Sequence, residues 1–133
     1  MAALVTFFLG LLSIQCKRDN MLIKADILKI QDSVVLETIE FKIQHFRHYN
    51  NKVNLPNGGY TCLSMVENGK PFSVVARCSH NQAFSRKHGV YECLKKYIQR
   101  FHANDDSDVL VSLDRTNPRH YAVYFSVHKK GTI

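Results

Sequence analysis

One segment of the chain has the pattern of an amphipathic helix, and its surroundings limit what that helix can pack against. Residues 83–101 read AFSRKHGVYECLKKYIQRF. Their large apolar side chains recur at helical spacing, as Val90, Leu94, Tyr97, Ile98 and Phe101. A lone helix must bury such a stripe against another element. The segments on both sides of it have the pattern of β-strands, so we expect the helix to cover a sheet.

Alternation between apolar and polar residues is clearest over residues 34–46. Apolar residues recur there at every second position, which is typical of a half-buried strand. The apolar set is Val35, Ile39, Phe41 and Ile43, and the opposite set is Thr38, Glu40, Lys42 and Gln44. Together with residues 22–30, this segment predicts a hairpin that turns at Asp32 and Ser33.

Two further hairpins are predicted. Asn68 and Gly69 separate the apolar runs 60–66 and 71–78, and this dipeptide favours a type I′ turn because both central residues need positive φ. Residues 109–114 and 121–127 are strand-like and are joined by the basic turn RTNPRH. Residues 48–59 are rich in Asn and Gly and predict a loop.

These elements give the order ββββαββ. The sequence therefore predicts a single α+β domain over residues 21–133, with a mostly antiparallel sheet and one amphipathic helix packed on it. A chain of 133 residues is long enough to bury its own core.

Residues 1–20 form a separate apolar segment. It is apolar from Ala2 to Ile14 and basic at Lys17 and Arg18. The apolar run is shorter than the roughly 20 residues that cross a bilayer. Three interpretations stay open: a signal or membrane anchor that contacts the membrane through residues 2–16, a helix that packs on this domain or a partner, and an N-terminal extension before Met21. The first would make the protein membrane-attached or secreted, whereas the basic domain alone favours the cytoplasm.

The chain is basic, with a formal net charge of +7. Such an excess favours anionic partners, although a soluble protein without a polyanionic partner also has this composition. The four cysteines are Cys16, Cys62, Cys78 and Cys93, and they form no CxxC pair. This usage favours reduced thiols over a disulfide framework.

A basic loop precedes the predicted helix. Ser85, Arg86, Lys87, His88 and Gly89 stand where the helix should begin. Unpaired amides and partial positive charge at a helix N-terminus stabilise an anion, and a glycine lets a phosphate approach the backbone. The alternative is that Ser85 only caps the helix and the cations form a solvated corner.

Other cations extend this predicted anion-binding set: Lys95, Lys96, Arg100, Arg115, Arg119, Lys129 and Lys130. The favoured hypothesis is a small domain that contacts nucleic-acid phosphate. One alternative is a protein-interaction module, an inhibitor or accessory subunit, that binds an acidic protein. Another is a membrane-attached or secreted domain that binds a polyanion.

Metal binding and catalysis have weak support. The weak metal-ligand candidates are Cys78, His80, His88 and Cys93, whose spacing matches no known zinc finger. The same thiols and imidazoles are the only candidate nucleophile–base pairs, and no local motif supports them. We therefore expect a binding protein with no cofactor rather than an enzyme.

Overall fold

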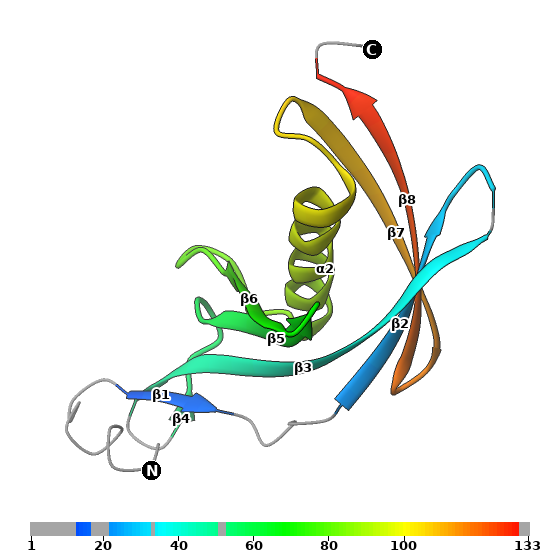
Figure 1. Ribbon diagram of the computed structural model, residues 1–133. Helices are drawn as coiled ribbons and strands as arrows, with labels where there is room; N and C mark the ends of the chain where they lie inside the picture. Colours follow the sequence, from blue (N-terminus) through cyan, green and yellow to red (C-terminus); the bar gives the residue numbers. More distant parts are fainter. Residues whose placement is uncertain (1–12, 17–21, 33, 51–52, 131–133) are drawn as a thin grey trace.

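The computed structural model describes residues 13–16, 22–32, 34–50 and 53–130 (Figure 1). The interpretations of residues 1–12 and 17–20 lie outside these ranges, while Ser13–Cys16 form a strand. The elements, in chain order, are β1 (Ser13–Cys16), β2 (Leu22–Lys29), β3 (Val35–Asn50), β4 (Val53–Asn54), β5 (Tyr60–Glu67), β6 (Lys70–Arg77), α2 (Arg86–His102), β7 (Ser107–Asn117) and β8 (His120–Lys129).

The predicted fold class was wrong. The protein is mostly β, and its strands form one curled, mixed sheet rather than an antiparallel ββββαββ arrangement. The main path of the sheet has the order β6-β5-β3-β2-β8-β7, and the short strands β1 and β4 add to β3. The sheet curls as a half-barrel around α2, which lies in its concave side (Figure 1).

The sheet is mixed because β2 and β8 pair in parallel, with Lys24 opposite His120 and Lys29 opposite Phe125. Every other strand pair of the described chain is antiparallel. Alternation of apolar and polar residues tells which face of a strand is buried, but it does not specify the direction of a distant partner. Local pattern therefore predicted the hairpins and missed the one pairing that joins the two ends of the fold.

Strand β3 is longer than expected and is shared by four partners. It pairs with β2 from Val35 to Lys42 and with β5 from Lys42 to Phe46, on opposite edges. One edge then pairs with β1 from Phe46 to Tyr49, and the other pairs with β4 at Tyr49 and Asn50. This pairing draws residues 48–50 and 53–54 into the sheet, so the predicted loop over residues 48–59 is in part strand.

The three predicted hairpins are confirmed by the strand registers of β2–β3, β5–β6 and β7–β8. At the β5–β6 turn, Asn68 has φ 52° and Gly69 has φ 78°. Positive φ at both positions is what a type I′ turn requires. Here the local sequence alone determined the turn.

The apolar stripe of α2 forms the centre of the core, where Val90, Leu94, Tyr97 and Ile98 are buried. They pack on the inner face of the sheet, whose most buried side chains include Ile27, Phe41, Leu63, Val123 and Phe125. Each such side chain contributes about 1.5–3 kcal/mol on burial.

Two residues assigned to buried faces are exposed instead. Phe101 is 39% exposed at the end of α2, and Val35 is 48% exposed beyond a register shift in the β2–β3 pairing. Both lie at the ends of elements, where the sheet no longer covers them. In the part of the chain that the structure describes, no helix is long and apolar enough to cross a membrane.

Candidate functional site

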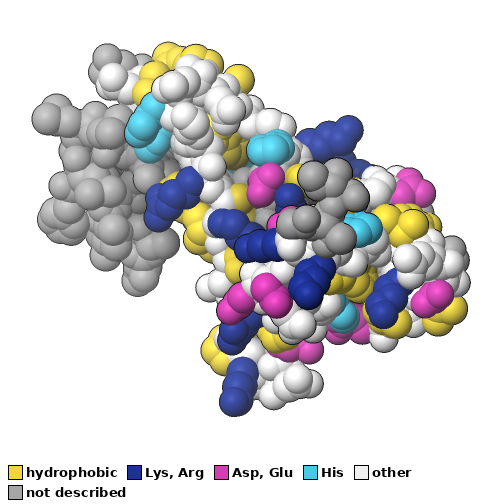
Figure 2. Space-filling model, turned by 90° about the horizontal axis from the view of Figure 1, so that it is seen from above, with side chains coloured by type: hydrophobic (Ala, Val, Ile, Leu, Met, Phe, Trp, Pro, Cys, Tyr) yellow, Lys and Arg dark blue, Asp and Glu magenta, His cyan; other side chains and the backbone are white. Residues whose placement is uncertain are grey.

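On the face of the protein shown in Figure 2, the Lys and Arg side chains do not form one continuous patch. Lys and Arg side chains are interspersed there with Asp, Glu and apolar side chains. A mixed surface of this kind is typical of soluble proteins. A candidate anion site must therefore be found from local geometry, and the start of α2 is the place to begin.

Ser85 is the N-cap of α2. Its backbone is extended, at φ −133° and ψ 119°, and its hydroxyl oxygen accepts a hydrogen bond from the His88 amide at 3.1 Å. The amide of Gly89 donates to the Ser85 carbonyl at 3.0 Å. Capping satisfies one of the free amides at a helix start. The structure thus shows Ser85 as the cap of the helix, which was the alternative to a phosphate contact.

Gly89 has a different role from the one predicted. It is buried, and a Cβ atom added to it would lie 2.0 Å from Thr61 Oγ1 and 2.7 Å from Thr61 Cβ. Such distances exclude any side chain without movement of strand β5 or the helix. Gly89 therefore allows close packing of α2 on the sheet and does not offer its backbone to a phosphate.

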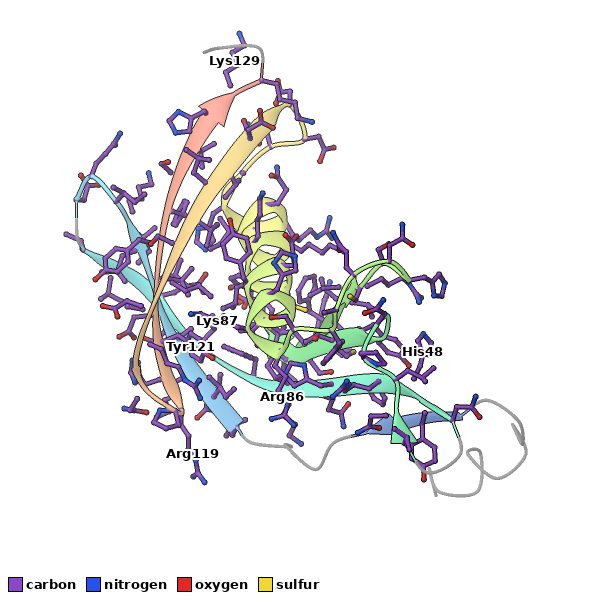
Figure 3. The ribbon with its side chains drawn as sticks, turned by 180° about the vertical axis from the view of Figure 1, so that it is seen from behind. His48, Arg86, Lys87, Arg119, Tyr121 and Lys129 are labelled. Carbon is purple, nitrogen blue, oxygen red and sulfur yellow. The ribbon has the colours of Figure 1, made fainter. Side chains whose placement is uncertain are left out.

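A cavity of about 520 Å³ lies between the first turn of α2 and the β7–β8 hairpin. Three cationic residues line it, namely Arg86, Lys87 and Arg115. Its other described lining residues are mostly apolar: Ile23, Ile43, His45, Val90, Leu113, Pro118 and Tyr121. In Figure 3, Lys87 and Tyr121 lie beside each other between the helix and the hairpin, and Arg86 lies at the foot of the helix. The cavity thus joins a basic opening to an apolar interior.

Arg115 is held in place by a ring and a carbonyl rather than by a described carboxylate. The Arg115 guanidinium carbon lies 5.6 Å from the centre of the Tyr121 ring, a cation–π contact, and Arg115 Nη2 donates to the Pro118 carbonyl at 3.5 Å. Among the described residues, neither Arg115 nor Lys87 forms an ion pair with a carboxylate. A cation without a carboxylate partner keeps its full attraction for an incoming anion.

His45 is the deepest polar side chain in the lining. It is 4% exposed, and its Nδ1 atom lies 2.8 Å from Thr61 Oγ1. Its ring also makes an edge contact with Phe84, with the centroids 5.8 Å apart. These contacts hold the imidazole between Thr61 on β5 and Phe84 in the segment before α2, so the cavity has one fixed polar group beside its apolar lining residues.

The remaining predicted cations lie elsewhere. Lys96 Nζ donates to the Val75 carbonyl at 2.7 Å, and Arg100 lies over the Phe101 ring at 6.0 Å. Arg119 projects from the tip of the β7–β8 hairpin, away from the cavity (Figure 3). The other members of the set are Lys95, half-buried on α2, and Lys129 and Lys130 at the far end of β8.

Lys129 lies at the opposite end of the molecule from Arg86 and Lys87 (Figure 3). A strand of the length of β8 spans about 30 Å. The predicted set of twelve residues is therefore split by the structure. Arg86, Lys87 and Arg115 line the cavity of about 520 Å³ together, and Arg119 follows in the β7–β8 turn. Ser85, His88 and Gly89 line another cavity on the other side of the helix start, beside Cys78 and Phe84.

The weak metal candidates do not converge. Cys93 is fully buried, and its thiol contacts the Thr61 carbonyl at 3.5 Å, whereas His88 is exposed and faces Glu92. His80 stacks on His48, with the ring centroids 6.0 Å apart. Within the described ranges, no three His, Cys, Asp or Glu side chains are placed to hold a metal ion.

Burial raises the pKa of the Cys93 thiol to about 12, with the nearby Cys62 as a smaller cause. A thiol with such a pKa is almost entirely protonated at neutral pH and is a poor nucleophile. Cys78 makes its own local contact, with its thiol 3.3 Å from the Gln82 carbonyl. The pairing of Cys93 with a histidine base therefore has no support in the geometry.

A polar cluster that the sequence did not predict lies toward the other end of α2. The Tyr97 hydroxyl donates to Glu37 Oε2 at 2.8 Å and to Glu67 Oε2 at 3.2 Å, and His102 Nε2 lies 2.6 Å from Glu37 Oε2. Burial, followed by the hydrogen bond to Glu37, raises the pKa of Tyr97 above its ordinary value. Tyr97 was assigned to the apolar stripe, and no local pattern connects it with Glu37 on a distant strand.

No family model, no curated protein and no solved structure matches this chain significantly. Functional inference therefore depends on the geometry of the protein itself.

Proposed function

We propose that this protein is a small binding domain that holds nucleic-acid phosphate at the opening of the cavity between α2 and the β7–β8 hairpin. The observation that carries this proposal is the convergence of Arg86 and Lys87, from the first turn of α2, with Arg115, from β7, around one cavity. The two elements are separated in the sequence by the rest of the helix and a loop. Their cations meet only because the sheet curls around the helix.

Phosphate suits these groups. Arg presents a planar fork that matches a phosphate, and Lys supplies a compact charge that needs no fixed orientation. Arg119 lies at the hairpin tip and points away from the cavity, so it is not part of the proposed site. The scattered cations on the rest of the surface add long-range attraction for a polyanion without forming part of the site.

The test is binding of a labelled oligonucleotide as a function of salt concentration. The double variant Lys87→Ala/Arg115→Ala should bind at least tenfold more weakly than the wild type at low salt. Each lost phosphate contact lowers the slope of log K against log [salt] by about 0.7–0.9, so the slope should fall by roughly 1.4–1.8.

The matched control is Lys129→Ala/Lys130→Ala, which removes the same charge at the far end of β8. This control should keep most of the affinity. The proposal is wrong if the wild type binds no nucleic acid at low salt, or if both double variants lose affinity equally. Co-purification with an acidic protein that nuclease treatment leaves intact would instead favour the protein-interaction alternative.

A further inference from the structure

The cavity has more apolar lining residues than a phosphate site requires. A phosphate needs only the cations at the opening, whereas Ile23, Ile43, Val90 and Leu113 line the interior. Apolar walls do not stabilise a phosphate, but they favour a flat ring whose faces are apolar. The volume of about 520 Å³ lies within the range of roughly 300–1,000 Å³ that is typical of pockets for small ligands.

The charge of the lining limits the occupant further. None of the described residues that line this cavity is acidic. The opposite holds for the cavity of about 560 Å³ between β3 and β5, where Glu37, Glu40 and Glu67 are among the lining residues. An anionic ligand is therefore favoured in the first cavity and disfavoured in the second.

Arg115 and Tyr121 lie beside each other at the opening. The Arg115 guanidinium carbon is 5.6 Å from the centre of the Tyr121 ring, a cation–π contact, and Arg115 is exposed while Tyr121 is 9% exposed. An exposed guanidinium is a group on which a nucleic-acid base can stack. The same Arg115 also serves the basic opening, so the base and its phosphate would be bound next to each other.

We propose that the cavity takes the base of one unstacked nucleotide while its phosphate lies at Lys87 and Arg115, so that the protein prefers single-stranded over double-stranded nucleic acid. This inference rests on the proposed function and specifies its ligand. In a duplex the bases are stacked and paired, so only its phosphates reach the protein and the apolar interior stays unfilled. The shared chemistry, a base joined to a phosphate, also occurs in a free nucleotide.

The experiment compares three ligands on the wild-type protein: a single-stranded oligonucleotide, its duplex, and a phosphodiester strand of equal length without bases. Anisotropy titrations should show the single strand binding about tenfold more tightly than the other two, because one base stacked on a protein surface contributes about that factor. A free mononucleotide in competition distinguishes the two sources. If it competes as well as the oligonucleotide, the ligand is a nucleotide and the preference for a strand is wrong.

A protein variant tests the cavity directly. Leu113→Trp, on the half-buried side chain that lines the cavity, should reduce affinity for the single strand about tenfold and leave the duplex affinity unchanged. Leu110→Trp is the matched control, since Leu110 lies on the same strand and is 59% exposed. It should change neither affinity. A thermal melt of both variants shows whether they are folded. If Leu113→Trp does not fold, the comparison with the strand that lacks bases still tests the inference.

The outcomes separate the two proposals. If all three ligands bind equally and Lys87→Ala/Arg115→Ala still weakens binding, phosphate binding stands and the inserted base is wrong. If no ligand binds at low salt, both proposals fail. If the single strand binds best and Leu113→Trp removes only that preference, the inference is supported.

Discussion

The two ends of α2 hold their charged groups in different ways. At the first turn, Lys87 and, across the cavity, Arg115 form no ion pair with a described carboxylate. Toward the last turn, Glu37 receives hydrogen bonds from Tyr97 and His102, and Glu67 accepts a second contact from the same tyrosine. The charged groups at the first turn thus lack a described carboxylate partner, whereas those toward the last turn are hydrogen-bonded to one another.

This difference separates charges that stabilise the fold from charges that can bind a ligand. A half-buried carboxylate that accepts a hydrogen bond from a core side chain is costly to disturb, because its partners lose their bonds as well. A cation held by a ring and a carbonyl can exchange those contacts for an anion at little cost. Changes at the last turn should therefore affect stability, and changes at Lys87 and Arg115 should affect binding.

The largest effect on stability is expected at Gly89, where the first turn of α2 meets β5. In an open helix position, Gly→Ala would stabilise the protein by about 1 kcal/mol. Here the added Cβ meets Thr61 at 2.0 Å, so Gly89→Ala should instead lower the free energy of unfolding by roughly 1–3 kcal/mol. Chemical denaturation measures this change.

Gly69→Ala is the control for this prediction. No atom lies within 4 Å of a Cβ added there, and the only cost is positive φ at 78°. That cost should be about 1 kcal/mol. A Gly89→Ala protein as stable as the wild type would show that α2 does not pack on Thr61 as described.

An effect of comparable size is expected at the last turn, from Tyr97→Phe. This change keeps the ring and removes the hydroxyl that donates to Glu37 and Glu67. Loss of a hydrogen bond to a charged group should cost about 1.5–3 kcal/mol. Phosphate binding at the other end of the helix should stay unchanged, and a loss of both properties would contradict the separation of the two ends.

A smaller effect is expected outside both ends, where β2 and β8 pair. Asp26 accepts hydrogen bonds from Thr38 Oγ1 at 2.7 Å and from His120 Nε2 at 2.8 Å. The Thr38 bond, followed by that of His120, holds the pKa of Asp26 below its ordinary value of 3.8. A group whose pKa is lower in the folded state contributes stability above its unfolded pKa and loses it as the pH falls through the folded pKa.

Thr38→Val should therefore destabilise the protein by about 0.5–1 kcal/mol at neutral pH. The difference from the wild type should shrink toward zero once the pH lies below the folded pKa of Asp26. Urea denaturation at several pH values checks this course. A difference that stays constant with pH would show that Thr38 acts through packing and not through the carboxylate.

The smallest perturbation probes the middle of α2, between its two ends. Burial raises the pKa of the Cys93 thiol to about 12, so the thiolate is scarce at pH 8. Alkylation followed by peptide mass spectrometry should label the half-buried Cys62 and Cys78 before Cys93. Rapid labelling of Cys93 in the folded protein would mean that α2 opens locally from the sheet, and the two ends would then not be independent.

Local sequence determined part of this fold. The Asn68-Gly69 turn, the apolar stripe of α2 and the cap at Ser85 each depend on neighbours in the chain, and the structure has all three. The parallel pairing of β2 with β8 depends on residues at opposite ends of the domain, and alternation does not specify it. The added strands β1 and β4 are short and lack enough residues to show a period.

The sequence predicted the residues of the candidate site, but not which of them lie together. Arg86, Lys87 and Arg115 were in the predicted set, but so were Lys129 and Lys130 at the far end of the protein. The sequence shows which residues are charged, but only the topology shows which of them lie close together in space. Gly89 was predicted to contact a phosphate because its packing against Thr61 could not be foreseen. Thr61 lies on β5, and no local sequence pattern connects β5 with the helix.

The position of β8 has a consequence for synthesis of the protein. This strand comes last among the described elements, yet it lies inside the sheet, between β2 and β7. While the chain emerges from the ribosome, β2 has an open edge and α2 lacks part of its cover until residues 120–129 have left the exit tunnel. Exposed edges of this kind can pair with other strands, so we expect the nascent chain to be most prone to aggregation before β8 inserts.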